Sequence, residues 1–158
     1  MQDWQDIGLA RETFETLCRT LDKKEWRYQK EDEKLTLFCG AKGDDLPIDI
    51  HFTLDPERML IVMVSHLPFV TPEDKRLDTA IAVSAVNNLL AHGCFDFDLK
   101  SGHMFFRMSN SFIESRIGEE LFAYLLMAAC NVVDEYNDKF LMLGKGNLSL
   151  QQFLEELP

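Results

Sequence analysis

The segment from Leu67 to Arg107 constrains the fold more than any other part of this chain, because it predicts an apolar helix followed directly by a β-hairpin. The Thr71 hydroxyl can cap the start of the helix, and Pro72 suits the first helical position, where its missing N–H costs nothing. Gly93 is typical of the residue just past a helix end. We therefore predict a helix from Thr71 to His92.

The predicted helix has no wide polar face. From Leu77 to Ala91 it is apolar or small almost all the way round, so it must be covered on more than one side. A sheet can cover one side, and a second copy of the chain is the simplest cover for the other. We therefore predict a homodimer, with these candidate interface residues: Ala80, Val83, Ser84, Val86 and Asn87.

The residues on both sides of Ser101-Gly102 alternate between apolar and polar types, which predicts the two strands of a hairpin. A two-residue turn at that dipeptide sets three cross-strand pairs: Leu99 with Met104, Phe97 with Phe106, and Asp96 with Arg107. The first two pairs place the apolar side chains on one face of the sheet. The third pair is predicted to be an exposed ion pair between neighbouring strands.

The chain resembles a known family in two segments, TPEDKRLDTAIAVSAVNNLLAHGCFDFDLKSGHMFFR and DEYNDKFLMLGKGNLSLQQFLEEL. It is similar there to the YbjN-like family, whose members adopt the α+β fold of type III secretion chaperones. The resemblance runs from about Met59 to the end of the chain. It brings no catalytic residues, and it implies a regulatory or protein-binding role.

The resemblance and the pattern of the whole chain together predict an α+β, type III secretion chaperone-like fold. The expected order is a helix, about four antiparallel strands, a helix, a β-hairpin, a long C-terminal helix and a short terminal helix. Met59 to Val64 is continuously apolar, so we expect this strand to lie centrally with both faces covered. Ser149 and Gln152 have the spacing of a capping box for the terminal helix. We expect one domain over residues 1–158.

The composition bears on partners and location. The chain has 16 Lys and Arg against 27 Asp and Glu, a net charge of −11, and such a surface repels phosphate backbones and anionic lipid headgroups. Its longest uninterrupted apolar stretch, Leu121 to Cys130, is shorter than the ~20 residues that cross a bilayer. The start MQDWQDIGLA lacks the basic and apolar regions of a signal peptide. We expect a cytoplasmic protein with no nucleic-acid partner and no membrane insertion.

Candidate catalytic pairs fail on placement. His92 and Cys94 are close in sequence, but the first closes a helix and the second opens a strand, so no group is predicted to orient the imidazole. Asp96 and Asp98 lie on one strand face roughly 7 Å apart. Pairing of Asp96 with Arg107 on a solvated face is favoured over an acid–base pair.

Metal, redox and phosphate sites are also not predicted. His51, with Asp49 and Asp55 nearby, offers a metal too few ligands. The motif Gly144-Lys145-Gly146 lacks the spacing of a phosphate loop and is predicted to end the long helix. No cysteine pair has the spacing of a zinc or redox site, so we predict four buried free thiols: Cys18, Cys39, Cys94 and Cys130.

These observations favour a non-enzymatic, dimeric protein-binding module without a cofactor, whose protein or peptide partner the sequence does not name. The alternative is a regulatory or scaffolding dimer that handles no client. An enzyme is the third hypothesis, and a cleft that collects Asp96, Asp98 and His103 with perturbed pKa values would favour it.

Overall fold

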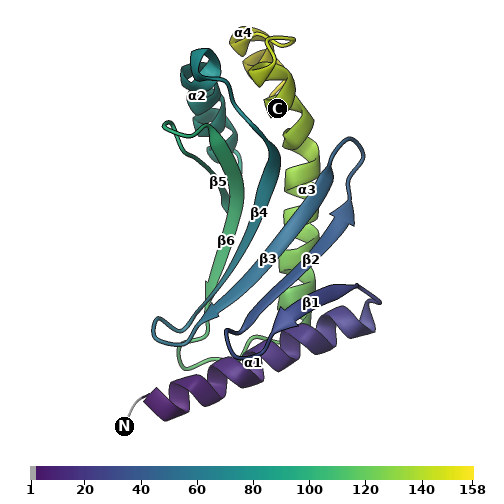
Figure 1. The fold of residues 1–158 in the computed structure, drawn as a ribbon, viewed down its shortest axis with the longest axis vertical. Coiled ribbons are helices and arrows are strands. Elements are labelled where there is room, and N and C mark those ends of the chain that lie inside the picture. The colour runs from purple at the N-terminus through teal and green to yellow at the C-terminus, as the bar shows by residue number, and fades with distance from the viewer. Residues whose placement is uncertain (1–2) are drawn as a thin grey trace.

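The computed structural model describes residues 3–158, with side chains from Ile7 onward. The elements follow one another in this order: α1 (Asp3–Lys23), β1 (Tyr28–Glu31), β2 (Thr36–Lys42), β3 (Pro47–Asp55), β4 (Leu60–Val70), a short 3-10 helix η1 (Glu73–Lys75), α2 (Arg76–Asn87), β5 (Cys94–Phe97), β6 (His103–Ser111), α3 (Glu119–Gly144) and α4 (Leu150–Glu155) (Figure 1). The predicted α+β order is confirmed, from the first helix to the short terminal one.

The strands form one antiparallel sheet of six strands in the order β1-β2-β3-β4-β6-β5. The central position predicted for the apolar strand is confirmed, because β4 pairs with β3 on one side and with β6 on the other. Only one of its faces is fully covered. Ile61 and Met63 are buried, whereas Val62 and Val64 on the opposite face are half-buried.

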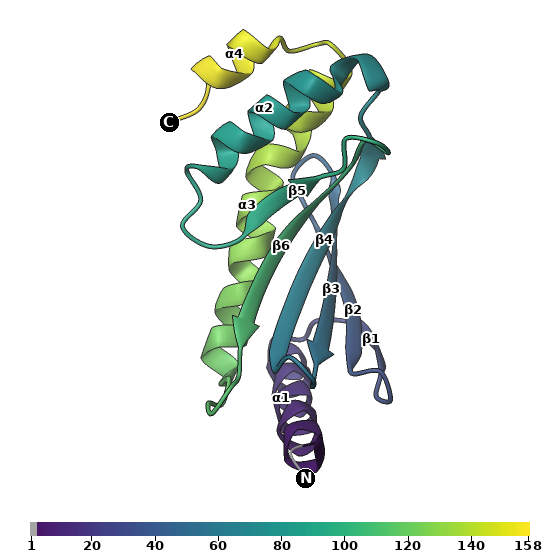
Figure 2. The same cartoon turned by 90° about the vertical axis from the view of Figure 1, so that its left-hand side faces the viewer.

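The helices leave one face of the sheet open. In Figure 1 the sheet lies in front of α3 while α1 crosses its lower end, and Figure 2, turned by 90°, places α3 on one side of the sheet only. The buried side chains of α1 recur every three or four residues, and those of β3 alternate along the strand. They are Ala10, Phe14, Leu17 and Leu21 in α1 and Ile48, Ile50, Phe52 and Leu54 in β3, among others. The core therefore lies between the sheet and the helices, and the other sheet face carries no helix in either view.

The start of the central helix differs from the prediction. α2 begins at Arg76 after the turn of 3-10 helix, and the Thr71 hydroxyl is buried without a hydrogen-bond partner, so Thr71 is not an N-cap. The physical reason is that Pro72 has an extended backbone (φ −57°, ψ 151°), which keeps Thr71 outside the helix, just past the end of β4. The Thr71 N–H donates to the Gly102 carbonyl at 2.9 Å, which ties the end of β4 to the hairpin turn.

The end of the central helix also differs, because α2 stops at Asn87 rather than at His92. The Asn87 side chain binds both backbone groups of Phe95: its Oδ1 accepts from the Phe95 N–H at 2.8 Å, and its Nδ2 donates to the Phe95 carbonyl at 2.9 Å. Gly93 is left-handed (φ 83°), as predicted for the turn, but a Cβ there would lie 2.5 Å from the Phe106 ring. Close packing against β6 therefore adds to the need for glycine.

The hairpin register is shifted by two residues from the predicted one. The observed pairs are Cys94 with Arg107, Phe95 with Phe106, Asp96 with Phe105, and Phe97 with Met104. The turn is longer than predicted, because Asp98 N–H donates to the His103 carbonyl at 2.9 Å and closes a loop of four residues. A shift of two preserves which side chains face the core, so the apolar face is as predicted. Leu99, now inside the loop, is 53% exposed.

The two C-terminal helices join the core through aromatic side chains. α3 begins after its N-cap Gly118. The predicted capping box of α4 is confirmed, since the Ser149 hydroxyl accepts from Gln152 N–H at 3.2 Å and Gln152 Oε1 accepts from Ser149 N–H at 3.0 Å. Phe153 is buried with its ring centroid 5.3 Å from that of Phe140. α4 therefore docks on its own chain.

Candidate functional site

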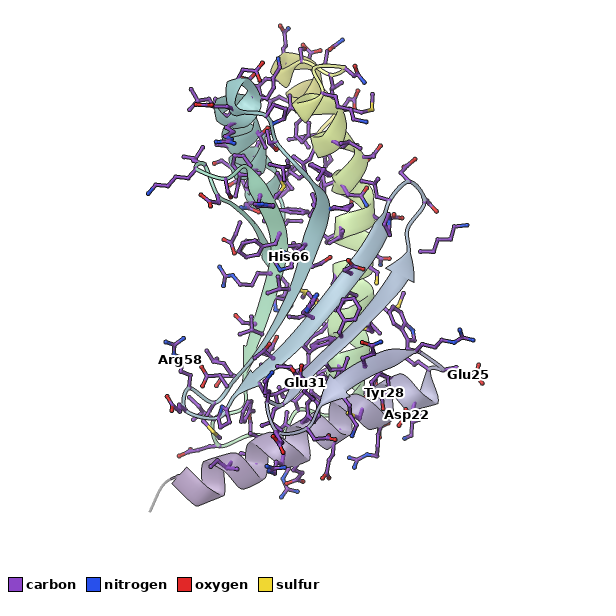
Figure 3. The ribbon with its side chains drawn as sticks, viewed as in Figure 1. Asp22, Glu25, Tyr28, Glu31, Arg58 and His66 are labelled. Carbon is purple, nitrogen blue, oxygen red and sulfur yellow. The ribbon has the colours of Figure 1, made fainter. Side chains whose placement is uncertain are left out.

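A row of aromatic side chains crosses the open face of the sheet. Strand alternation directs Phe38 of β2, His51 of β3, His66 of β4 and Phe105 of β6 to this face, and we call these four residues the aromatic row. The pairing registers bring them together, because Phe38 lies opposite His51 and His66 lies opposite Phe105. Figure 3 labels His66 at mid-height on the sheet.

The rings of the aromatic row are in contact from one end to the other. The ring centroids of Phe38 and His51 are 4.6 Å apart, those of His51 and His66 are 5.9 Å apart with perpendicular planes, and those of His66 and Phe105 are 5.5 Å apart. Such spacings are typical of favourable aromatic pairs. The row therefore offers a continuous band of flat, partly apolar surface across four strands.

The electrostatics of the row keep one imidazole neutral. Burial lowers the pKa of His51 from its usual value, the nearby His66 lowers it further, and Asp49 partly offsets both effects. Because the shift is downward from a value already below neutral pH, the neutral form of the His51 imidazole is favoured at pH 7. The band is thus uncharged at His51 under ordinary conditions.

A shallow groove of about 470 Å³ adjoins the row on the side of β1 and β2. Phe38 and His51 belong to its lining, and Lys30, Glu31 and Lys34 supply its charges. Two ion pairs hold those charges near their own strand and turn, Lys34 with Glu31 at 2.6 Å and Lys30 with Asp32 at 2.8 Å. The groove joins a polar rim to an aromatic floor, a combination typical of surfaces that bind proteins.

The second exposed apolar surface lies on α2. Leu77 is 75% exposed and Ile81 is 51% exposed, and with Ser84 they follow the four- and three-residue spacing of one helix face. We call these three residues the α2 stripe. In Figure 2, α2 lies at the upper end of the molecule, away from α1.

The structure separates the five predicted interface residues. Val83 and Val86 are buried in the chain's own core, and Asn87 is occupied by β5. Ala80 is half-buried and Ser84 is exposed. The side of α2 that carries Val83 and Val86 therefore packs into the core, whereas Leu77 and Ile81 are exposed on another side.

The predicted catalytic pairs do not converge. His92 stacks on Tyr124 at 5.8 Å between ring centroids, while the Cys94 Sγ lies 3.6 Å from Arg107 Nη2. The pKa of the Cys94 thiol is raised, mainly by burial and then by Asp96, so the thiol is no activated nucleophile. His92 and Cys94 thus have separate neighbours.

The two aspartates of the hairpin have separate structural roles. Asp96 Oδ2 accepts from Arg107 Nε at 2.7 Å, so the predicted ion pair forms, although it is diagonal rather than directly opposite. The Asp98 carboxylate accepts from Lys100 N–H at 2.9 Å and from the Ser101 hydroxyl at 2.7 Å, which holds the turn. These hydrogen bonds lower the pKa of Asp98, and neither of the two described cavities is lined by these aspartates or by His103.

The other predicted sites have mixed outcomes. Among the side chains that the structure describes, from Ile7 to Pro158, no group of three or more His, Cys, Asp and Glu residues is placed to hold a metal ion. Gly144-Lys145-Gly146 ends α3 as predicted, with Gly146 left-handed at φ 74°. All four cysteines are free thiols, but only Cys18 and Cys39 are fully buried, and Cys130 is half-buried like Cys94. Within the described part of the chain, no helix has the length and apolarity needed to cross a membrane.

Of the aromatic row, sequence reasoning singled out only His51; it gave no role to Phe38 or Phe105, and it missed the contact between His51 and His66. The signal that could have found it is the register of the β3–β4 hairpin, which places Val64 opposite His51 and so brings His66 beside it. The sequence alone did not predict this register, because the turn between the strands, which contains Pro56 and the left-handed Met59, matches no standard short hairpin turn.

Comparison with known proteins gives matches to solved structures only. No protein-family model matches the sequence, and no curated protein matches it. YbjN from E. coli, which has been proposed to be a transcription regulator, matches with a TM-score of 0.57 and 16% identity over 80% of this chain and 92% of YbjN. A chain of the ExsC–ExsE complex matches with a TM-score of 0.55 and 12% identity over 82% of this chain and 94% of that one.

A chain of the HopA1–SchA chaperone–effector complex matches with a TM-score of 0.49 and 17% identity, over 80% of this chain and 90% of that one. At these identities the matches with TM-scores above 0.5 establish the fold. The chain has the YbjN-like fold that type III secretion chaperones share, as the sequence predicted.

Proposed function

We propose that this chain is a non-enzymatic protein-binding module that works as a homodimer and holds an extended segment of a partner protein on the open face of its sheet. The observation that carries the proposal is the aromatic row, four contiguous rings on a face that no helix covers. Exposed aromatic side chains supply contact area at low entropic cost, and they dominate many protein interfaces. The ExsC–ExsE complex shows that a chain of this fold forms a complex with another protein.

The row suits an extended segment better than a folded surface. It runs across β2, β3, β4 and β6, so a chain lying along it crosses the strands and contacts each ring in turn. The adjoining groove supplies charged groups of both signs at one end. The net charge of −11 opposes a nucleic-acid partner on the same face.

The experiment compares partners captured from the native cells by three tagged proteins. They are the wild type, a row variant Phe38→Asp/Phe105→Asp, and a control Ser109→Asp/Asn147→Asp that adds the same charge at exposed positions outside the row and the groove. Quantitative mass spectrometry should find proteins that the wild type and the control retain and the row variant loses. Circular dichroism checks that all three are folded. Equal capture by all three proteins would contradict binding through the row.

The homodimer is proposed to form through the α2 stripe, since Leu77 and Ile81 expose more apolar surface than a solvated helix needs. Ser84 and Ala80 allow close approach beside them, whereas the other predicted interface residues face inward. Light scattering at tens of micromolar should give twice the mass of one chain, and Ile81→Asp should halve it. A monomeric wild type would refute the dimer and leave the sheet-face proposal standing.

A regulatory or scaffolding dimer that holds no client is the second candidate, favoured by the likeness to YbjN. The same capture experiment separates the two functions. A client that fills the row is lost in the row variant, whereas a partner that binds only the dimer is lost in Ile81→Asp and retained in the row variant.

A further inference from the structure

We propose that His51 and His66 form a two-imidazole site for a divalent transition-metal ion such as Zn²⁺, Ni²⁺ or Cu²⁺. The two rings are 5.9 Å apart between centroids and perpendicular, and they come from adjacent paired strands on the open face of the sheet. The inference is independent of any protein partner, because both ligands belong to this chain.

The separation of the two ring centroids is within reach of a chelate. Two imidazole nitrogens, each about 2.0–2.1 Å from a tetrahedral Zn²⁺, place their ring centroids roughly 5.2 Å apart. The observed separation exceeds this by less than 1 Å. Both side chains are exposed, so rotation about their side-chain torsions can turn a nitrogen of each ring toward one ion without moving the strands.

The surroundings prepare the two rings for a metal. Phe38 contacts His51 from one side and Phe105 contacts His66 from the other, so the imidazoles are bracketed by apolar rings. An apolar bracket lowers the local dielectric around the ligands. His51 is kept neutral, which leaves a ring nitrogen lone pair free for coordination.

The donor set selects the class of ion. Neutral imidazole nitrogens suit Zn²⁺, Ni²⁺ and Cu²⁺, whereas Mg²⁺ and Ca²⁺ require oxygen ligands. Among the described side chains of residues 7–158, no third His, Cys, Asp or Glu completes the site. Two positions of a tetrahedral ion therefore remain open to water, and the affinity is set by these two histidines alone.

The chain provides its own matched control, since it has four histidines and the other two lie elsewhere. His92 stacks on Tyr124, and His103 starts β6 after the hairpin turn. The control variant His92→Ala/His103→Ala removes as many imidazoles as the variant His51→Ala/His66→Ala. It also removes the only histidine close in sequence to a cysteine, Cys94.

The test is a titration of the purified metal-free protein with ZnCl₂ at pH 7.5, followed by calorimetry and by NMR of the imidazole nitrogens. The wild type and the control variant should bind one Zn²⁺ per chain with equal affinity and shift the nitrogens of His51 and His66. His51→Ala and His66→Ala should each weaken binding at least about tenfold.

Two results would overturn the inference. Unchanged Zn²⁺ affinity in His51→Ala or His66→Ala would show that the ring pair does not chelate. Loss of binding in the control variant would place the ion at His92 or His103 instead.

Discussion

Substitution of Asn87 by alanine tests the side-chain hydrogen bonds that tie the C-terminal end of α2 to strand β5 of the hairpin. Its side chain makes two hydrogen bonds, at 2.8 and 2.9 Å, to the N–H and the carbonyl of Phe95, and both end in the Ala variant. Phe95 is 2% exposed, and each buried backbone group left without a partner costs about 1–3 kcal/mol. Because β5 is the edge strand, water can reach part of the freed backbone. We therefore expect a loss of about 2–3 kcal/mol.

The loss is measured by urea unfolding followed by circular dichroism at one protein concentration. For a chain of this size it corresponds to a fall in Tm of about 4–12 °C. Asn88→Ala is the matched control, since Asn88 is exposed and adjacent, and such surface changes stay within about 0.5 kcal/mol. The m-value should be unchanged if only the folded state is affected. Equal losses in the two variants would refute the reasoning that the side-chain bonds to Phe95 secure β5.

Three further perturbations have expected outcomes. A double-mutant cycle on Asp96 and Arg107 should give a coupling of no more than about 1 kcal/mol, because both side chains are a third or more exposed. The pKa of Asp98 is lowered in the folded state, so its carboxylate stabilises the fold fully above the unfolded pKa of about 3.9, and this contribution is lost as the pH falls through the folded pKa. In urea titrations, Asp98→Asn should therefore lose less stability than the wild type between pH 5 and pH 2. Val83→Glu should unfold the chain, because it buries a charge in the core, whereas Ile81→Glu should stay folded by circular dichroism.

The two edges of the sheet are protected in different ways. At one edge, Asn87 occupies the backbone groups of Phe95 that another strand would use. At the other edge, β1 has only four residues and includes charged side chains. Short, charged or covered edges discourage pairing with strands of other chains. Binding across the face of the sheet, as proposed, therefore needs no free edge.

The sequence by itself determined the order of elements, the central position of β4, the capping box of α4 and the inward face of the hairpin. Each of these depends on local periodicity or on residues a few positions apart, and such patterns persist whatever the tertiary context. The ion pair of Asp96 with Arg107 was also within reach, because a register error of two residues keeps side chains on the same face.

The tertiary structure alone decided three features. It decided which side of the apolar helix faces the core, because Val83 and Val86 fit the sheet while Leu77 and Ile81 are left outside. It decided where that helix ends, because Asn87 gains two bonds to a strand that follows it. It also brought His66 beside His51, since that contact depends on the register across a hairpin and on a face without a helix. Periodicity in a sequence shows that a residue is apolar or alternates, but which neighbour it contacts is set by how the elements pack.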